Sequence, residues 1–194
     1  MGLGKNNALL VIDIQQADFL EMTDDNLAEP RWDRIRGARR ALDVFRALGL
    51  PVIQVKEVHR PDMVDFGRDL DGAEDVHCIE TDPGTDYARL TYPLPDEYLI
   101  SKRRYSAFFG TDLEILLRGL GVDTLWLVGG LTDVCIHYTA VDAHQRDYRF
   151  RVLTDAVAGS GEEAHRHALR AMQYLQRDAL TTVSTLEALA AAGE

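Results

Sequence analysis

The sequence has only two cysteines, Cys78 and Cys135, among its 194 residues. Two cysteines cannot form the disulfide framework of a small secreted domain, and they lack the CxxC spacing of thiolate zinc sites and redox dithiols. Each cysteine therefore needs its own explanation. For Cys78 the favoured interpretation is a small buried apolar side chain, which is what most free cysteines are.

Long apolar stretches and an excess of positive charge are also missing. No run approaches the ~20 apolar residues that span a bilayer. The first residues, MGLGKNNALLVIDIQ, show neither the apolar core of a signal peptide nor the Ser or Thr of a myristoylation signal. The 32 acidic and 21 basic residues give a net charge of −11, which repels nucleic acid and anionic lipid. We therefore expect a cytoplasmic protein that binds neither nucleic acid nor membranes.

The chain does contain six short apolar runs, rich in β-branched residues and separated by stretches of helical periodicity. Runs that are apolar on both faces predict parallel strands buried between helices. The predicted fold is α/β: one domain over residues 1–194 with three layers and a Rossmann-like open parallel sheet of about six strands, covered by helices on both faces. The predicted strands are 8–14, 51–58, 97–102, 124–130, 150–157 and 179–185, and the predicted helices are 31–48, 111–119, 133–146, 161–177 and 185–192.

The segment 59–96 has no clear period and is rich in Asp, Gly and Pro. A long irregular segment inside a compact domain is usually functional. We therefore predict that it covers a pocket. Its apolar residues Met63, Val64, Phe66 and Leu70 stand among charges, and we expect them to anchor a homodimer or homotetramer.

Polar residues at the predicted strand ends indicate an active site, because ligands of open α/β sheets bind beyond the carboxyl ends of the strands. Asp13 ends the first strand and Lys102 the third. After the fourth strand, two glycines permit a sharp turn, Thr132 or Asp133 is placed to cap the next helix, and Cys135 follows in its first turn.

The helix N-terminus and a nearby lysine would lower the pKa of the Cys135 thiol below its ordinary value of ~8.5. The sequence therefore predicts covalent acyl transfer. Cys135 is the nucleophile, the Asp13 carboxylate is the proton acceptor, and the Lys102 ammonium stabilises and orients the charges.

Four segments carry a resemblance to a known family: VIDIQQADF at 11–19, KRRYSAFFGTDL at 102–113, VGGLTDVCIHYTA at 128–140 and VLTDAVAG at 152–159. In these segments the sequence resembles the cysteine hydrolases of the isochorismatase-like superfamily, which includes nicotinamidases, N-carbamoylsarcosine amidase, biuret hydrolase and ureidoacrylate amidohydrolases. The resemblance implies a catalytic triad of Asp13, Lys102 and Cys135. It also implies a cis peptide at Gly130–Leu131 and an oxyanion hole formed by the backbone N–H groups of Leu131 and Cys135.

The resemblance further implies an amidohydrolase that acts on a small amide or ureide. Isochorismatases proper act on a vinyl ether and typically lack the nucleophilic cysteine, so the presence of Cys135 favours hydrolysis of a C–N bond. The expected route is a thioester intermediate, with release of ammonia or an amine. An isochorismatase-type vinyl ether hydrolase and a non-enzymatic binding module on the same fold remain alternatives.

A metal-assisted nicotinamidase is a further alternative. Glu57, His59 and His77 fall roughly where metal-binding nicotinamidases carry their ligands, and a carboxylate with two imidazoles suits zinc or iron. However, Asp65 stands in place of a further histidine. Hydrogen-bonded pocket histidines are the favoured interpretation, and we expect no cofactor.

Candidate substrate contacts lie beside the motifs. We expect Phe19, Tyr105, Phe108 and Tyr138 to form an apolar wall around a small planar substrate, with ordinary packing between helix and sheet as the alternative. Arg60 or Arg103 is a candidate partner for a substrate carboxylate or ureide oxygen, although a solvated surface role is favoured for either arginine.

Overall fold

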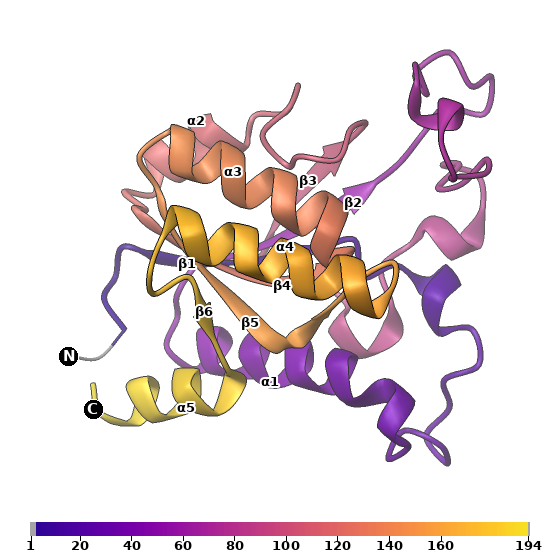
Figure 1. Ribbon diagram of the computed structural model, residues 1–194. Coiled ribbons are helices and arrows are strands. Elements are labelled where there is room, and N and C mark those ends of the chain that lie inside the picture. Colours follow the sequence, from indigo (N-terminus) through magenta and orange to yellow (C-terminus); the bar gives the residue numbers. More distant parts are fainter. Residues whose placement is uncertain (1–2, 194) are drawn as a thin grey trace.

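Six parallel strands form one open sheet in the computed structural model, which describes residues 3–193. The strand order is β3-β2-β1-β4-β5-β6, so the chain begins in the middle, runs outward through β2 and β3, and returns to place β4 beside β1 (Figure 1). This confirms the predicted Rossmann-like sheet. The strands are β1 (Asn7–Ile12), β2 (Val52–Glu57), β3 (Tyr98–Lys102), β4 (Thr124–Gly130), β5 (Arg149–Ala158) and β6 (Leu180–Thr181).

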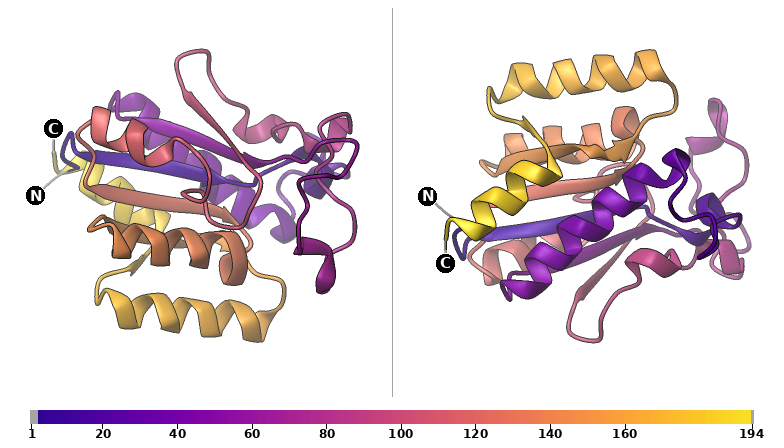
Figure 2. Two further views of the ribbon diagram at one scale, coloured as in Figure 1. Left: turned by 90° about the horizontal axis from the view of Figure 1, so that it is seen from above. Right: turned by 90° about the horizontal axis from the view of Figure 1, so that it is seen from below.

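Helices cover both faces of the sheet, as predicted. One face carries α1 (Asp33–Ala47) and α5 (Val183–Ala191), and the other carries α2 (Leu113–Gly119), α3 (His137–Gln145) and α4 (Glu162–Leu175), as Figure 2 shows. No helix within residues 3–193 is both long and apolar enough to cross a membrane.

The two faces have separate hydrophobic cores, because side chains alternate along each strand. In β1, Leu10 and Ile12 pack against α2 and α3, whereas Leu9 and Val11 pack against α1. Fully burying an aliphatic side chain of this kind stabilises the fold by about 1.5–3 kcal/mol. This two-sided burial explains why β1 is apolar on both faces from Ala8 to Ile12.

Two predicted elements have different bounds in the structure. The predicted strand 179–185 is reduced to β6, because the Thr182 side chain accepts a hydrogen bond from the Thr185 amide and starts α5. The predicted helix 133–146 begins with a π-helical turn, Thr132–Ile136, before α3.

The segment between β2 and β3, residues 58–97, forms an excursion at the carboxyl ends of the strands. It contains three short 3-10 helices: Asp69–Asp71, Pro83–Thr85 and Arg89–Thr91. Gln15 ties it to the sheet, since its Nε2 donates to the carbonyls of Glu57 at 3.0 Å and of Thr85 at 2.9 Å. The excursion is thereby held over the ends of β1 and β2.

Candidate active site

Four polar side chains meet at the carboxyl ends of neighbouring strands. Asp13 follows β1, Glu57 and Lys102 end β2 and β3 in register with each other, and Cys135 lies in the turn after β4. The chain reverses its direction of winding between β1 and β4, and open α/β sheets bind their ligands at such a point. Three of these residues are the predicted triad. The fourth, Glu57, was expected only as a possible metal ligand.

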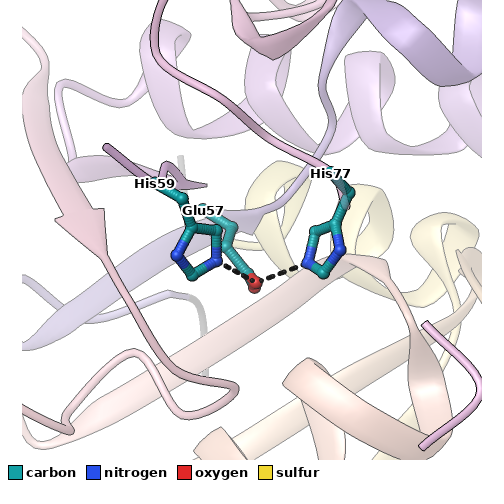
Figure 3. A group of neighbouring side chains, drawn as sticks. All are labelled: Glu57, His59 and His77. Carbon is teal, nitrogen blue, oxygen red and sulfur yellow. Dashed lines mark hydrogen bonds and ion pairs between the residues drawn. The ribbon is translucent and has the colours of Figure 1, made fainter. Parts of the chain in front are cut away.

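Glu57 is the centre of a hydrogen-bonded cluster (Figure 3). Its Oε1 accepts from His59 Nε2 at 3.2 Å and from His77 Nε2 at 3.0 Å, and its Oε2 accepts from Lys102 Nζ. Burial alone would favour the neutral acid, but the hydrogen bond from His77 and the Lys102 ammonium hold the pKa of Glu57 well below its usual range. The hydrogen bond to Glu57 in turn raises the pKa of His77 to about 9. Near neutrality Glu57 is therefore an anion and His77 a cation.

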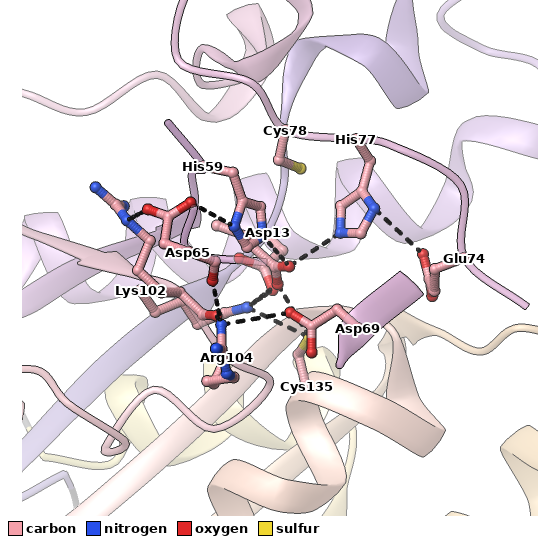
Figure 4. A network of polar contacts seen from close by, with 12 residues as sticks. Asp13, His59, Asp65, Asp69, Glu74, His77, Cys78, Lys102, Arg104 and Cys135 are labelled. Carbon is pink, nitrogen blue, oxygen red and sulfur yellow. Dashed lines mark hydrogen bonds and ion pairs between the residues drawn. The ribbon is translucent and has the colours of Figure 1, made fainter. Parts of the chain in front are cut away.

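Lys102 is fully buried and joins the two carboxylates to the thiol (Figure 4). Its Nζ lies 2.8 Å from Asp13 Oδ2 and 3.4 Å from Cys135 Sγ, besides its contact with Glu57. Burial disfavours the ammonium, but the carboxylates of Asp13 and Glu57 raise the pKa of Lys102. A buried charge persists only when it is paired in this way.

Asp13 has a backbone conformation that few non-glycine residues adopt, with φ of 52°. Burial raises the pKa of Asp13 against the opposing effect of Lys102, and the Glu57 anion raises it further. Within the described residues neither carboxylate oxygen accepts a hydrogen bond of good geometry, so the contact with Lys102 is an ion pair. The carboxylate keeps free acceptor positions for a proton.

Cys135 lies in the π-helical turn and is buried, with 7% of its surface exposed. Burial raises the pKa of its thiol, the anions Asp13 and Glu57 raise it further, and Lys102 opposes them. The expectation of a lowered pKa was therefore wrong, because it counted the lysine and the helix terminus but neither the burial nor the second carboxylate. The resting thiol is neutral, and a thiolate forms only when a proton acceptor takes its proton.

The turn that carries Cys135 is fixed by its neighbours. Gly129 has φ of 118°, and a Cβ there would lie 1.9 Å from the carbonyl oxygen of Ile12, so only glycine fits. The following peptide, Gly130–Leu131, is cis, at the position that the resemblance implies. The expected side-chain cap is not formed. Instead Asp133 accepts hydrogen bonds from the amide of Ser160 at 2.9 Å and from its hydroxyl at 2.5 Å, which ties the turn to the loop after β5.

A cavity of about 620 Å³ contains Asp13, Glu57 and Cys135. The 58–97 excursion contributes part of its lining, as predicted: Glu74, Val76, His77, Cys78, Asp82, Gly84 and Thr85. Its volume is within the usual range of small-molecule pockets.

Two of the four residues of the predicted apolar wall line the cavity. Phe19 and Tyr105 line the cavity. Phe108 instead belongs to the core beneath α2 and α3 and packs against Tyr148. Tyr138 is 51% exposed and does not line the cavity. It stacks on Tyr105, with 5.7 Å between the ring centroids. The sequence placed all four near the motifs but could not show which side of the chain each one faces.

Three other expectations change in the structure. Arg60 and Arg103 do not line the cavity, because both pair with Asp65. Cys78 is half-buried and lines the cavity, so the interpretation as a buried apolar residue was wrong. Phe66 is 2% exposed and stacks on His59 at 3.9 Å between ring centroids, so it offers no surface anchor for a second subunit.

The candidate metal ligands do come together. The ligand atoms of Glu57, His59 and His77 lie within 4.8 Å of one another, and a carboxylate with two imidazoles is a known zinc ligand set. By residue type and proximity the three side chains fit a metal. They already satisfy one another by hydrogen bonds, and the Lys102 ammonium beside Glu57 would oppose a nearby dication.

Comparison with known proteins places the chain in a known family. The isochorismatase domain family matches residues 7–188. The ureidoacrylate amidohydrolase RutB of Methylorubrum extorquens is 30% identical over 202 residues, which is 91% of this chain and 75% of that protein. Two isochorismatase-family proteins of Bacillus subtilis are matched over only 55% and 39% of their own length.

Solved structures agree with this placement. N-carbamoylsarcosine amidase from Thermoplasma acidophilum superposes with a TM-score of 0.76 at 31% identity, covering 92% of this chain and 96% of that one. A cysteine hydrolase from Pseudomonas syringae superposes with a TM-score of 0.85 at 26% identity, covering 100% of this chain and 97% of that one. The fold is thus that of isochorismatase-like proteins. The chain belongs to the isochorismatase family.

Sequence reasoning considered Glu57 only as a metal ligand and missed its ion pair with Lys102. Part of the signal was present, because Glu57 is the last residue but one of the predicted strand 51–58. The structure pairs this strand with the one that ends at Lys102, and neighbouring strand ends lie about 5 Å apart. Sequence reasoning also missed Gln15, whose short side chain ties the excursion to the sheet.

Proposed function

We propose that the protein hydrolyses a C–N bond of a small amide or ureide through a thioester on Cys135. The contacts of Lys102 are the observation that carries this proposal. Its ammonium lies 2.8 Å from the Asp13 carboxylate and 3.4 Å from the Cys135 thiol, and both of these residues line one cavity. A nucleophile, a base and a fixed cation at such distances suit covalent catalysis.

In the first half-reaction the Cys135 sulfur attacks the carbonyl carbon while its proton moves to Asp13. The oxyanion that forms is stabilised by the amides of Leu131 and Cys135, which act as preorganised donors. Asp13 then gives the proton to the departing nitrogen, and ammonia or an amine leaves as the C–N bond breaks.

In the second half-reaction water attacks the thioester. Asp13, again ionised, accepts a proton from the water, and the C–S bond breaks as the thiol recovers its proton. Lys102 stays protonated through both half-reactions. Its positive charge therefore always compensates the repulsion between the Asp13 and Glu57 carboxylates. The acid product leaves and the resting state is restored.

The test is a screen of ammonia release over nicotinamide, biuret, N-carbamoyl amino acids and ureidoacrylate, with Cys135→Ala as the control. With the best substrate, rapid acid quenching and mass spectrometry of the intact protein should show an adduct on Cys135 equal in mass to the acyl group. Turnover that persists in Cys135→Ala would contradict the thioester route. Binding of these compounds without any turnover would favour a binding module.

A metal-assisted nicotinamidase is the second candidate, favoured by the grouping of Glu57, His59 and His77. These side chains would hold the ion, which would polarise the substrate or supply a bound water of lowered pKa. Metal analysis of the purified protein, with activity measured before and after chelation, separates the two. Stoichiometric metal together with loss of nicotinamide hydrolysis on chelation favours this candidate.

A further inference from the structure

The arginines of α1 and of the turn before it have unequal surroundings. Five of the six pair with carboxylates: Arg31 with Glu21 and Glu29, Arg36 with Asp33, Arg39 with Asp43, Arg40 with Glu187 and Arg46 with Glu97. Arg34 is the exception, because no side chain or carbonyl within residues 3–193 forms an ion pair or hydrogen bond with its guanidinium. The chain has 32 acidic and 21 basic residues, so carboxylates are available to pair with most arginines. The charge of Arg34 is nevertheless left without such a partner.

Arg34 lines the same cavity as Cys135. The other arginine in the lining, Arg31, has its charge compensated by Glu21 and Glu29, each at 2.8 Å, and its guanidinium lies over the Trp32 ring. Both ring nitrogens of His77 are engaged in hydrogen bonds, with Glu57 and with the Asp75 carbonyl. Among the described lining residues, Arg34 therefore presents the positive charge that is free to bind a ligand.

The rest of the cavity would repel an anion. Asp18, Glu74 and Asp82 line it together with the catalytic carboxylates. A substrate with a carboxylate would enter this negative field unfavourably unless a cation received it. A guanidinium offers two parallel N–H donors that match a carboxylate, and such a charge-assisted pair gives geometric specificity as well as affinity.

We propose that Arg34 binds a carboxylate of the substrate, so that the enzyme prefers a small amide or ureide acid, such as an N-carbamoyl amino acid, over neutral amides. The inference rests on the proposed C–N hydrolysis and adds the charge of the substrate. The carboxylate would dock at the start of α1 while the scissile carbonyl reaches Cys135 at the end of β4. Arg34 is then a specificity determinant at one edge of the cavity.

The experiment compares by ammonia release two ureides with the same urea group, N-carbamoylglycine, which ends in a carboxylate, and ethylurea, which ends in a methyl group. The wild-type enzyme should favour the acid. Arg34→Gln should reduce the ratio of kcat/KM for the acid to that for the urea by roughly ten- to a hundredfold, mainly through KM, the range expected for a charge-assisted contact. Arg31→Gln, the matched control at the same edge, should change the ratio by less than about threefold, as expected for exposed paired charges.

A second measurement does not depend on turnover. Calorimetry with Cys135→Ala should show binding of N-carbamoylglycine or of the longer 3-ureidopropionate, and adding Arg34→Gln should weaken it by the same factor. Arg34→Lys, which keeps the charge but loses the paired donors, should lie between.

Each outcome bears on one of the two claims. If ethylurea and the acid are hydrolysed equally well, or if both arginine variants change the ratio alike, the assignment of Arg34 is overturned while the proposed hydrolysis stands. If no compound of the screen is hydrolysed, the proposed hydrolysis fails, and calorimetry still decides about Arg34. Absence of binding of both acids, or binding that Arg34→Gln leaves unchanged, overturns the assignment.

Discussion

The two thiols of the protein share one cavity and yet have different surroundings. Cys135 stands at the carboxyl end of β4, on a turn that is tied to the sheet, and Cys78 stands on the 58–97 excursion. Burial and the anions Glu57 and Asp13 raise the pKa of the Cys78 thiol to about 12, and burial with the same two anions also raises that of Cys135. In the resting protein neither is a thiolate near neutrality.

What separates the thiols is the set of groups within reach. Cys135 Sγ lies 3.4 Å from the Lys102 ammonium, which also contacts Asp13, whereas the contact of Cys78 is with the Gln15 amide oxygen at 3.9 Å. A neutral thiol beside a carboxylate and a fixed cation can lose its proton as it attacks. The comparison teaches that a positioned base, and not a low resting pKa, distinguishes Cys135, the proposed nucleophile, from Cys78.

The largest expected effect comes from replacing each sulfur with oxygen. Cys135→Ser should reduce kcat by roughly 10⁴-fold or more, since removal of the nucleophile of a catalytic unit has effects of this size. Cys78→Ser should leave kcat within about threefold, because no base or cation positions that thiol. Steady-state kinetics on the best substrate measures both, and comparable losses in the two variants would remove the distinction drawn between the thiols.

Replacing the cation should have the next largest effect. Lys102→Met should lower kcat by at least ~10²-fold, because the stabilising charge at the reacting sulfur is lost. It should also lower the free energy of unfolding by about 3–5 kcal/mol, since Asp13 would then be buried beside the Glu57 anion without a compensating charge of its own. Kinetics below the unfolding transition separates the two effects. A folded variant with unimpaired kcat would show that the lysine only supports the structure.

The sequence predicted five of the six strands, four of the five helices and the meeting of Asp13, Lys102 and Cys135 with little error. These features depend on patterns along the chain: apolar runs, glycine at a sharp turn and polar residues at strand ends. The strand-end rule is strong because parallel strands bring their carboxyl ends to one edge of the sheet. For this reason residues more than a hundred positions apart could be placed together.

Features that depend on side-chain direction or on summed charge were not predictable in this way. Phe108 and Tyr105 stand three residues apart in one motif, but one enters the core and the other the cavity. The pKa of the Cys135 thiol depends on burial and on three charges from three strands. The sequence named the charges Asp13 and Lys102 but could not weigh them against Glu57 and the loss of solvent.

Removing Glu57 tests that balance directly. Glu57 raises the pKa of the Cys135 thiol, so Glu57→Gln should lower it, whereas Lys102→Met should raise it. For each pKa unit of decrease the thiolate fraction, and with it the rate of iodoacetamide labelling at pH 7, rises about tenfold. Glu74→Gln, another carboxylate of the same cavity, is the matched control and should leave the rate unchanged. Faster labelling in Lys102→Met than in Glu57→Gln would mean that the assigned signs are reversed.

The smallest expected difference is between the two thiols of the unaltered, substrate-free protein. Burial and the neighbouring anions raise both pKa values, so labelling of each should be slow at pH 7 and should accelerate through a midpoint above the ordinary thiol value of ~8.5. The sign follows from the raised pKa: the neutral thiol persists to higher pH, and the reactive thiolate forms only as the pH rises further. Digestion and mass spectrometry after timed alkylation resolve the two sites. A labelling midpoint below pH 7 for Cys135, with Cys78 still unreactive, would show that the resting site holds a thiolate paired with Lys102. The proton of Cys135 would then move to Asp13 before the substrate binds.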